Sequence, residues 1–146
     1  MADVLLLHGP NLNLLGEREP EVYGRATLDE YVGAFREAAA AHGLVVDDLQ
    51  SNSEATLVEA VHAARASKRA IVINAGALTH YSWSLHDALA AFDGIVVELH
   101  ISNPNAREPW RHVSVIAPVA DGSITGFGIA GYRLAAEAVH GLLGSR

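Results

Sequence analysis

Residues 70–76 read Ala-Ile-Val-Ile-Asn-Ala-Gly, and this stretch decides the fold. A short apolar run rich in β-branched residues, with no alternating polar positions, is typical of a strand buried on both faces of a parallel sheet. Asn74 follows the run directly, and Gly76 allows the chain to turn. The stretch therefore predicts an internal strand whose carboxyl end carries a polar side chain.

Apolar runs of the same kind recur along the chain with helical segments between most of them. They predict five strands, over residues 4–7, 44–49, 70–73, 94–99 and 113–116. A capping box at Thr27 and Glu30 predicts a helix that continues to about His42 and ends at Gly43. Three further helices are expected, one from about residue 53, one over 82–92 and one over 131–143.

This alternation predicts an α/β fold with a doubly wound, five-stranded parallel sheet. The simplest arrangement is flavodoxin-like, with strand order 2-1-3-4-5, right-handed crossovers and helices on both faces. The 146 residues suit a single domain over 1–146. Polar residues follow four strands, where ligands of such sheets bind: Asn11, Gln50-Ser51-Asn52, Asn74 and Glu98 to Asn103.

The composition limits the expected cellular compartment and the classes of binding partner. The chain has no cysteine, which excludes disulfides, thiolate metal ligands and a cysteine nucleophile, and fits the reducing cytoplasm. The net charge is −7 and the basic residues are scattered, so neither nucleic acid nor a membrane is an expected partner. No apolar run is long enough to span a membrane. A small molecule is expected, and Arg18, Arg111 and Asn74 could hold it if it is an anion.

The segment over residues 9–24 places an amide, a cation and a phenol after the first strand. Asn11, Arg18 and Tyr23 all lie in it. A cation near a phenol favours the phenolate, which would let Tyr23 act as a base near neutral pH. The alternative is an ordinary surface loop in which Tyr23 only packs.

A second group of candidates surrounds the fourth predicted strand. Strand alternation points Glu98 and His100 to one side, so the carboxylate can orient the imidazole and favour its protonated form as a general acid. The alternative is a structural ion pair. Arg111 could bind hydroxyls or a carboxylate or pair with Glu108, whereas Arg107 is expected to be structural.

Other candidates have equally plain alternatives. Asn74 could clamp a carboxylate or only satisfy turn backbone groups, and an imidazole, His80, follows close by. Asp87 by itself is expected to be a solvated helix charge. The glycines of the GxGxxG match at residues 126–131 are expected to serve a turn and helix packing, since a dinucleotide fingerprint opens the first βαβ unit. The single lysine, Lys68, precedes a strand at the opposite edge, which disfavours Schiff-base catalysis. The histidines lack zinc-site spacing, so no metal is expected.

Together these segments make the chain similar to the type II 3-dehydroquinate dehydratases, cofactor-free enzymes of the shikimate pathway. The resemblance covers nearly the full length. It rests on GPNLNLLGEREPEVYG at 9–24, QSN at 50–52, INAGALTH at 73–80, ELHISN at 98–103, AREPWRH at 106–112 and the GY at 131–132. Departures stand at Ser53, Ala55, Ala75 and Leu78, and Tyr81, Pro104-Asn105 and Trp110 are also unusual for the family.

The resemblance implies anti elimination of water from 3-dehydroquinate through an enolate, without a cofactor. It implies that Tyr23, made acidic by Arg18, is the base, that Asn11 stabilises the enolate through a water, and that His100, oriented by Glu98, is the acid. The implied substrate-binding residues are Asn74, His80, Ile101, Ser102 and Arg111. It also implies a homododecamer of four trimers in which Asp87 reaches a neighbour's site.

Two other functions remain open on the residues alone. One is a lyase or hydratase acting on another cyclic hydroxy acid, and a panel of substrates would separate it. The other is a non-catalytic binding module for a small anion, which turnover would exclude.

Overall fold

The computed structural model describes residues 2–146 and contains one parallel sheet in the order β2-β1-β3-β4-β5. This confirms the predicted strand order 2-1-3-4-5 and the predicted flavodoxin-like arrangement. Register places His8, at the end of β1, between Gln50 of β2 and Asn74 of β3, so three polar side chains end neighbouring strands together. The strands are β1 (Val4–His8), β2 (Val46–Gln50), β3 (Ala70–Asn74), β4 (Ile95–His100) and β5 (Gly122–Thr125).

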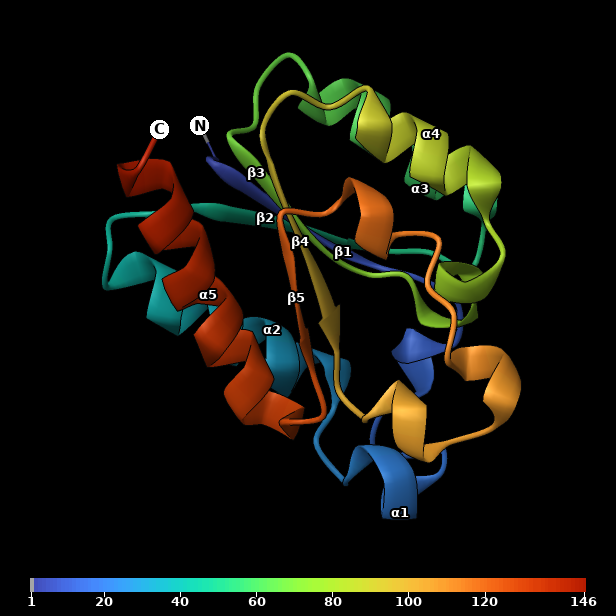
Figure 1. Ribbon diagram of the computed structural model, residues 1–146. Coiled ribbons are helices and arrows are strands. Elements are labelled where there is room, and N and C mark those ends of the chain that lie inside the picture. Colours follow the sequence, from blue (N-terminus) through green and yellow to red (C-terminus); the bar gives the residue numbers. More distant parts are fainter. Residues whose placement is uncertain (1) are drawn as a thin grey trace.

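Helices cover both faces of the sheet and create two separate hydrophobic cores. The helices are α1 (Pro20–Tyr23), α2 (Leu28–Ala40), α3 (Glu54–Ala64), α4 (Trp83–Ala90) and α5 (Gly128–Gly144). Helices α2 and α5 pack on one face, and α3 and α4 pack on the other (Figure 1). Apolar side chains of β1, β3 and β4 alternate between the two cores, and polar side chains appear only toward the carboxyl ends of these strands, at His8, Asn74, Glu98 and His100.

The starts of three helices follow from side-chain caps. Thr27 accepts a hydrogen bond from the Glu30 amide at 3.3 Å, as the capping box predicts. Ser53 and Ser82 cap α3 and α4 in the same way. Helix α2 ends at Ala40, two residues before the expected end, and Gly43 follows it with a φ of 73°. Among residues 2–146, no helix is both long and apolar enough to cross a membrane.

The expected fifth strand over 113–116 is wrong, because β5 is Gly122–Thr125. Val115 and Ile116 are buried, but they belong to an irregular segment that packs beside α4: the Val115 amide donates to Thr79 O and the Val115 carbonyl bonds to His86 Nδ1. Burial of an apolar run does not require a strand. The true edge strand is partly exposed and carries little apolar signal.

Two smaller differences concern helices. Helix α5 begins at Gly128 rather than at residue 131, and α1 is an unexpected single helical turn inside the segment 9–24. The glycines of the GxGxxG match serve the turn and the packing, as expected: Gly126 and Gly128 have positive φ, and Gly131 lies against Leu99 and Ile124 of the sheet.

Candidate functional site

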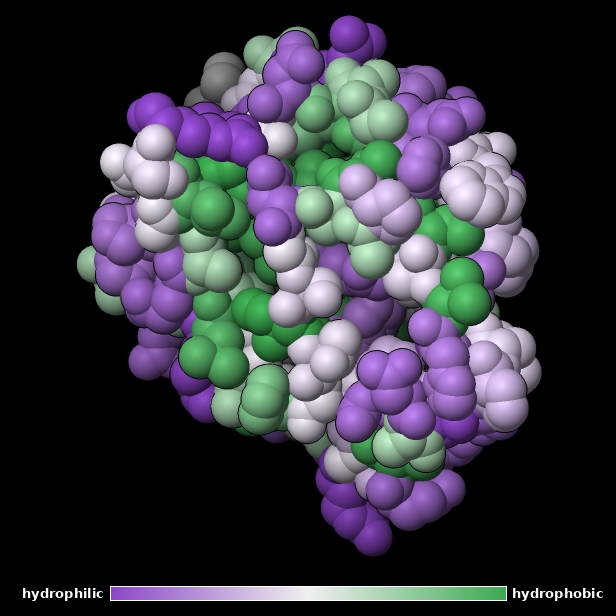
Figure 2. Space-filling model, viewed as in Figure 1, coloured by the Kyte–Doolittle hydropathy of each residue, from purple (hydrophilic) through white to green (hydrophobic). Residues whose placement is uncertain are grey.

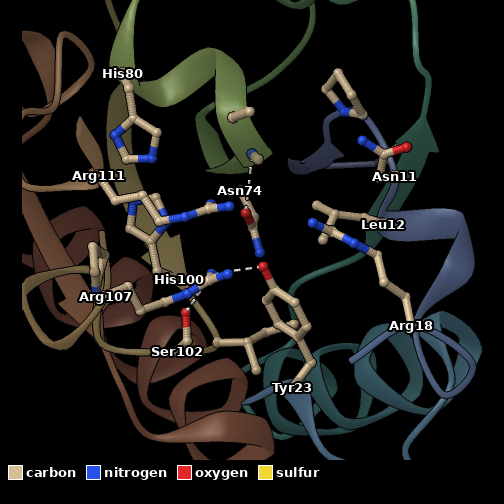
Figure 3. A pocket seen from close by; sticks show the side chains of 15 residues that line it. Asn11, Leu12, Arg18, Tyr23, Asn74, His80, His100, Ser102, Arg107 and Arg111 are labelled. Atoms are coloured by element: carbon tan, nitrogen blue, oxygen red, sulfur yellow. Dashed lines mark hydrogen bonds between the residues drawn. The ribbon is translucent and has the colours of Figure 1, made fainter. Parts of the chain in front are cut away.

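A pocket lies beyond the carboxyl ends of β1, β3 and β4 (Figure 3). This is the crevice in which doubly wound sheets bind ligands, where the strand order reverses between β1 and β3. The turns that follow β1 and β3 touch here, because a Cβ on Gly9 would come within 2.2 Å of Ala75 O. Nine of the eleven predicted site residues line the pocket: Asn11, Arg18, Tyr23, Asn74, His80, His100, Ile101, Ser102 and Arg111.

Tyr23 reaches the pocket from α1, with its hydroxyl between two cationic side chains. Arg107 Nη1 donates a hydrogen bond to the Tyr23 hydroxyl at 2.7 Å. The guanidinium carbons of Arg18 and Arg107 lie 5.3 and 5.1 Å from the centre of the Tyr23 ring. Arg18 also pairs with Glu19 at 3.1 Å. The cation that touches the phenolic oxygen is therefore Arg107, which the sequence analysis had treated as structural.

His100 and Glu98 form a buried pair at the end of β4, as strand alternation predicts. His100 Nε2 lies 2.7 Å from Glu98 Oε2, and only 3% of Glu98 is exposed. Ser114, which the sequence analysis did not single out, donates to the same carboxylate oxygen at 2.7 Å. The Ser114 oxygen in turn accepts hydrogen bonds from the amides of Ile116 and Ala117. The carboxylate is thus held by two donors and can hold the imidazole in one orientation.

Asn74 presents its amide nitrogen to the pocket. Its Oδ1 accepts a hydrogen bond from the Gly76 amide at 3.2 Å, so the NH₂ group is turned toward the Tyr23 hydroxyl (Figure 3). The turn requires Gly76, which has a φ of 60° and whose Cβ would meet Pro10 O at 2.9 Å. Asn74 therefore satisfies a backbone amide of the turn with its oxygen and lines the pocket with its NH₂ group.

Beneath Asn74 lies a buried imidazole–phenol pair. His8 Nε2 and the Tyr132 hydroxyl are 2.7 Å apart, and both residues are fully buried. Burial lowers the pKa of His8 to about 4, and burial raises the pKa of Tyr132. Both groups are therefore neutral at neutral pH, and neither is among the residues that line the pocket.

His80 and Arg111 approach from the side opposite Asn11 (Figure 3). His80 Nδ1 bonds to the Val113 carbonyl at 2.7 Å, which leaves Nε2 for another partner. Burial, more than the neighbouring His100 and Arg111, lowers the pKa of His80. Arg111 pairs with Glu108 and lies 4.0 Å over the Trp110 ring, so the expected ion pair exists while the side chain also lines the pocket.

The remaining predicted residues differ in how close they lie to the pocket. Ser102 receives a hydrogen bond from Arg107 at 3.4 Å, and the buried Ile101 lies beside it. The Asn11 backbone adopts a φ of 70° and its amide donates to Asn52 Oδ1. Asp87 lies on α4, and its strongly exposed side chain does not reach the pocket of its own chain.

Of the departures from the family pattern, Ser53, Ala55, Ala75 and Leu78 lie outside the lining of this pocket, whereas the unusual Pro104 lies in it. Ser53 caps α3, and Ala55 lies exposed on the same helix. Ala75 and Leu78 are buried in the core between the sheet and α3 and α4. Within residues 2–146, no three His, Asp or Glu side chains come together as a possible metal site.

A flavodoxin-like sheet with a phenol, an imidazole–carboxylate pair and several cations at its carboxyl edge defines an enzyme for acid–base chemistry on a small molecule. The family model "Dehydroquinase class II" matches residues 2–140. The chain belongs to the class II dehydroquinase family.

Individual relatives agree with this assignment over nearly the full length. The chain is 57% identical over 140 residues to the 3-dehydroquinate dehydratase of Xanthomonas oryzae pv. oryzae (strain PXO99A), covering 95% of each chain. It is 55% identical to that of Ruegeria pomeroyi, covering 95% of this chain and 93% of the relative. The crystal structure of the type II dehydroquinase from Butyrivibrio crossotus superposes with a TM-score of 0.91 at 39% identity, covering 94% of this chain and 97% of that one.

Proposed function

We propose that this pocket dehydrates 3-dehydroquinate to 3-dehydroshikimate, with Tyr23 as the base and His100 as the acid. By its family the chain is a 3-dehydroquinate dehydratase, a lyase of the shikimate pathway. The observation that carries the assignment of roles is that one pocket holds an arginine-bound phenol and a carboxylate-bound imidazole. These are the two proton-transfer groups that an elimination of water needs.

The first step removes the proton beside the ketone. Tyr23, as phenolate, takes this proton, and the electrons of the broken C–H bond form the enolate. The Arg107 guanidinium at the phenolic oxygen and Arg18 beside the ring stabilise the phenolate before the transfer. Asn11, at the rim of the pocket, stabilises the enolate oxygen through a bound water.

The second step expels the hydroxyl group. The enolate collapses to a carbon–carbon double bond as the C–O bond breaks, and protonated His100 gives its proton to the leaving oxygen, so water departs. Glu98, itself held by Ser114, keeps the imidazole directed at the substrate. Base and acid act on opposite faces of the ring, which corresponds to anti elimination.

The other pocket residues orient the substrate. Asn74, Ser102 and the Ile101 backbone hold its carboxylate, and His80 and Arg111 hold ring hydroxyls. His80 suits this role because its fixed Nδ1 contact leaves Nε2 directed away from the Val113 carbonyl. Holding the ring in a reactive position contributes rate without any bond being made to the protein.

Turnover tests the function directly. Purified protein with EDTA and 3-dehydroquinate should give an ultraviolet absorbance rise from the conjugated enone-carboxylate of the product. A second cyclic hydroxy acid that also carries a ketone serves as the comparison substrate. Turnover only of the second compound would favour the other-substrate lyase, and saturable binding without any turnover would favour the binding module.

We further propose that this single domain assembles into a homododecamer of four trimers in the cytoplasm, with no nucleic-acid or membrane partner. Large apolar side chains on the surface support an assembly that covers them (Figure 2). Tyr81 and Trp83 are each 61% exposed, and they lie on the chain close to Asp87. The absence of cysteine fits the cytoplasm, and the net charge of −7 fits the lack of a nucleic-acid or membrane partner.

If Asp87 completes a neighbour's site, two impaired variants should complement each other. Asp87→Asn alone should lose about tenfold or more in kcat/KM, the effect of one charge-assisted hydrogen bond. Mixed with Tyr23→Phe subunits and reassembled, it should regain part of the activity, because some sites then combine an intact Tyr23 with an intact Asp87 from a neighbour. Reassembled mixtures with no gain over the separate variants would place any role of Asp87 inside its own subunit.

A further inference from the structure

The base of this enzyme stands on a segment that cannot hold its own shape. Helix α1 is a single turn of four residues, and helices of that length are unstable without outside contacts. Two of its neighbours have left-handed backbone conformations, Glu19 with a φ of 41° and Gly24 with a φ of 79°. Something outside the segment must therefore fix the position of the Tyr23 backbone.

Tyr31 supplies such a contact. Its hydroxyl donates a hydrogen bond to the Tyr23 backbone carbonyl at 2.7 Å. Tyr31 is the fourth residue of α2, whose start is capped by Thr27. Only 2% of Tyr31 is exposed, and its ring packs 5.0 Å from the ring of Tyr132. The hydroxyl is thus presented from the core of the molecule.

The phenol of Tyr31 stays protonated at neutral pH and so remains a donor. Burial, with a smaller effect of Glu30, raises its pKa. The side chain of Tyr23 is held separately, through its own hydroxyl, by Arg107. The base therefore has two attachments, one to its backbone from α2 and one to its phenolic oxygen from the segment after β4.

We infer that Tyr31 is a positioning residue that holds the backbone of α1 where Tyr23 faces the pocket. This rests on the proposed role of Tyr23 as the base. Tyr31 touches no substrate, and its contribution is the fraction of molecules in which the segment is closed. The ring of Tyr31 packs in the core, whereas its hydroxyl alone bonds to Tyr23. A substitution that removes only the hydroxyl therefore tests the positioning role without removing the core packing.

Tyr31→Phe is the test, since it keeps the ring and removes the one hydrogen bond. Hydrogen exchange of the Tyr23 and Gly24 amides, which bond to Glu19 O and Pro20 O, should become about fivefold to tenfold faster. In steady-state assays kcat and kcat/KM should fall together by at most this factor, because kcat follows the closed fraction whereas exchange follows the open fraction. KM should change little, because the carboxylate and hydroxyl contacts of the substrate come from other segments.

Tyr132→Phe is the matched control, because it removes another buried phenolic hydroxyl from the same cluster without touching the segment. It should lower the melting temperature and leave exchange at Tyr23 and Gly24 unchanged. Exchange in Tyr31→Phe at the wild-type rate would overturn the inference, and so would faster exchange with normal kcat. Hydrogen exchange can be measured without turnover. It therefore tests whether Tyr31 holds the Tyr23 backbone even if the proposed reaction is wrong.

Discussion

Replacing Tyr23 by phenylalanine should lower kcat by about 10²- to 10⁴-fold, the usual contribution of a positioned general base. The substitution removes the oxygen that we propose takes the substrate proton, and it leaves the ring between Arg18 and Arg107. Contacts with the substrate carboxylate and hydroxyls come from other residues, so binding should survive. The measurement is kcat from the absorbance assay, together with the dissociation constant for the product 3-dehydroshikimate.

Tyr81→Phe is the matched control, because Tyr81 is exposed and does not line the pocket. It removes a phenolic hydroxyl and keeps the ring that the proposed assembly would cover, so it should turn over normally when gel filtration shows the same assembly as the wild type. Near-normal kcat in Tyr23→Phe would withdraw the base assignment. Loss of product binding together with kcat would instead make Tyr23 a binding residue.

Replacing His100 by alanine should damage kcat by a similar factor, about 10²- to 10⁴-fold, since the leaving oxygen then has no positioned proton donor. The change also leaves the buried Glu98 carboxylate without its imidazole partner, with Ser114 as its remaining donor. The space left by the side chain is about the size of imidazole. Added imidazole should therefore restore part of kcat, and more of it at a pH where imidazole is protonated.

The control for this rescue is the wild-type enzyme, which added imidazole should not accelerate. Rescue separates proton donation from a structural role, because a merely misfolded site gains nothing from a small molecule. If His100→Ala retained a normal kcat, the acid would have to be sought elsewhere in the pocket. Equal rescue by neutral and protonated imidazole would indicate space filling in place of proton transfer.

Most of the sheet could be predicted because its internal strands are buried on both faces. Three apolar runs, over 4–7, 70–73 and 94–99, each lie in or overlap a strand of the structure, and alternation correctly paired Glu98 with His100. The fifth strand could not be predicted in this way. It lies at the edge of the sheet, is partly exposed, and therefore lacks the apolar run that marks the others.

The same contrast applies to the pocket. Residues at strand ends, such as Asn74 and His100, are placed by the register of the sheet and were predictable from the topology. Arg107 and Ser114 lie in the long irregular segment between β4 and β5. Their contacts with Tyr23 and Glu98 depend on how that segment folds back over the sheet. The sequence of this segment has no periodic pattern from which its course over the sheet could be predicted.

The sequence by itself determined the alternation of strands and helices, the strand order, and the motifs that identify the family. These features could be predicted because they depend on the spacing of apolar and polar residues within short segments of the chain. The tertiary structure alone decided which cation touches Tyr23, which hydroxyl bonds to Glu98, and which hydroxyl bonds to the Tyr23 backbone. These contacts join residues that are eight to 84 positions apart, and the preferences of single segments do not specify them.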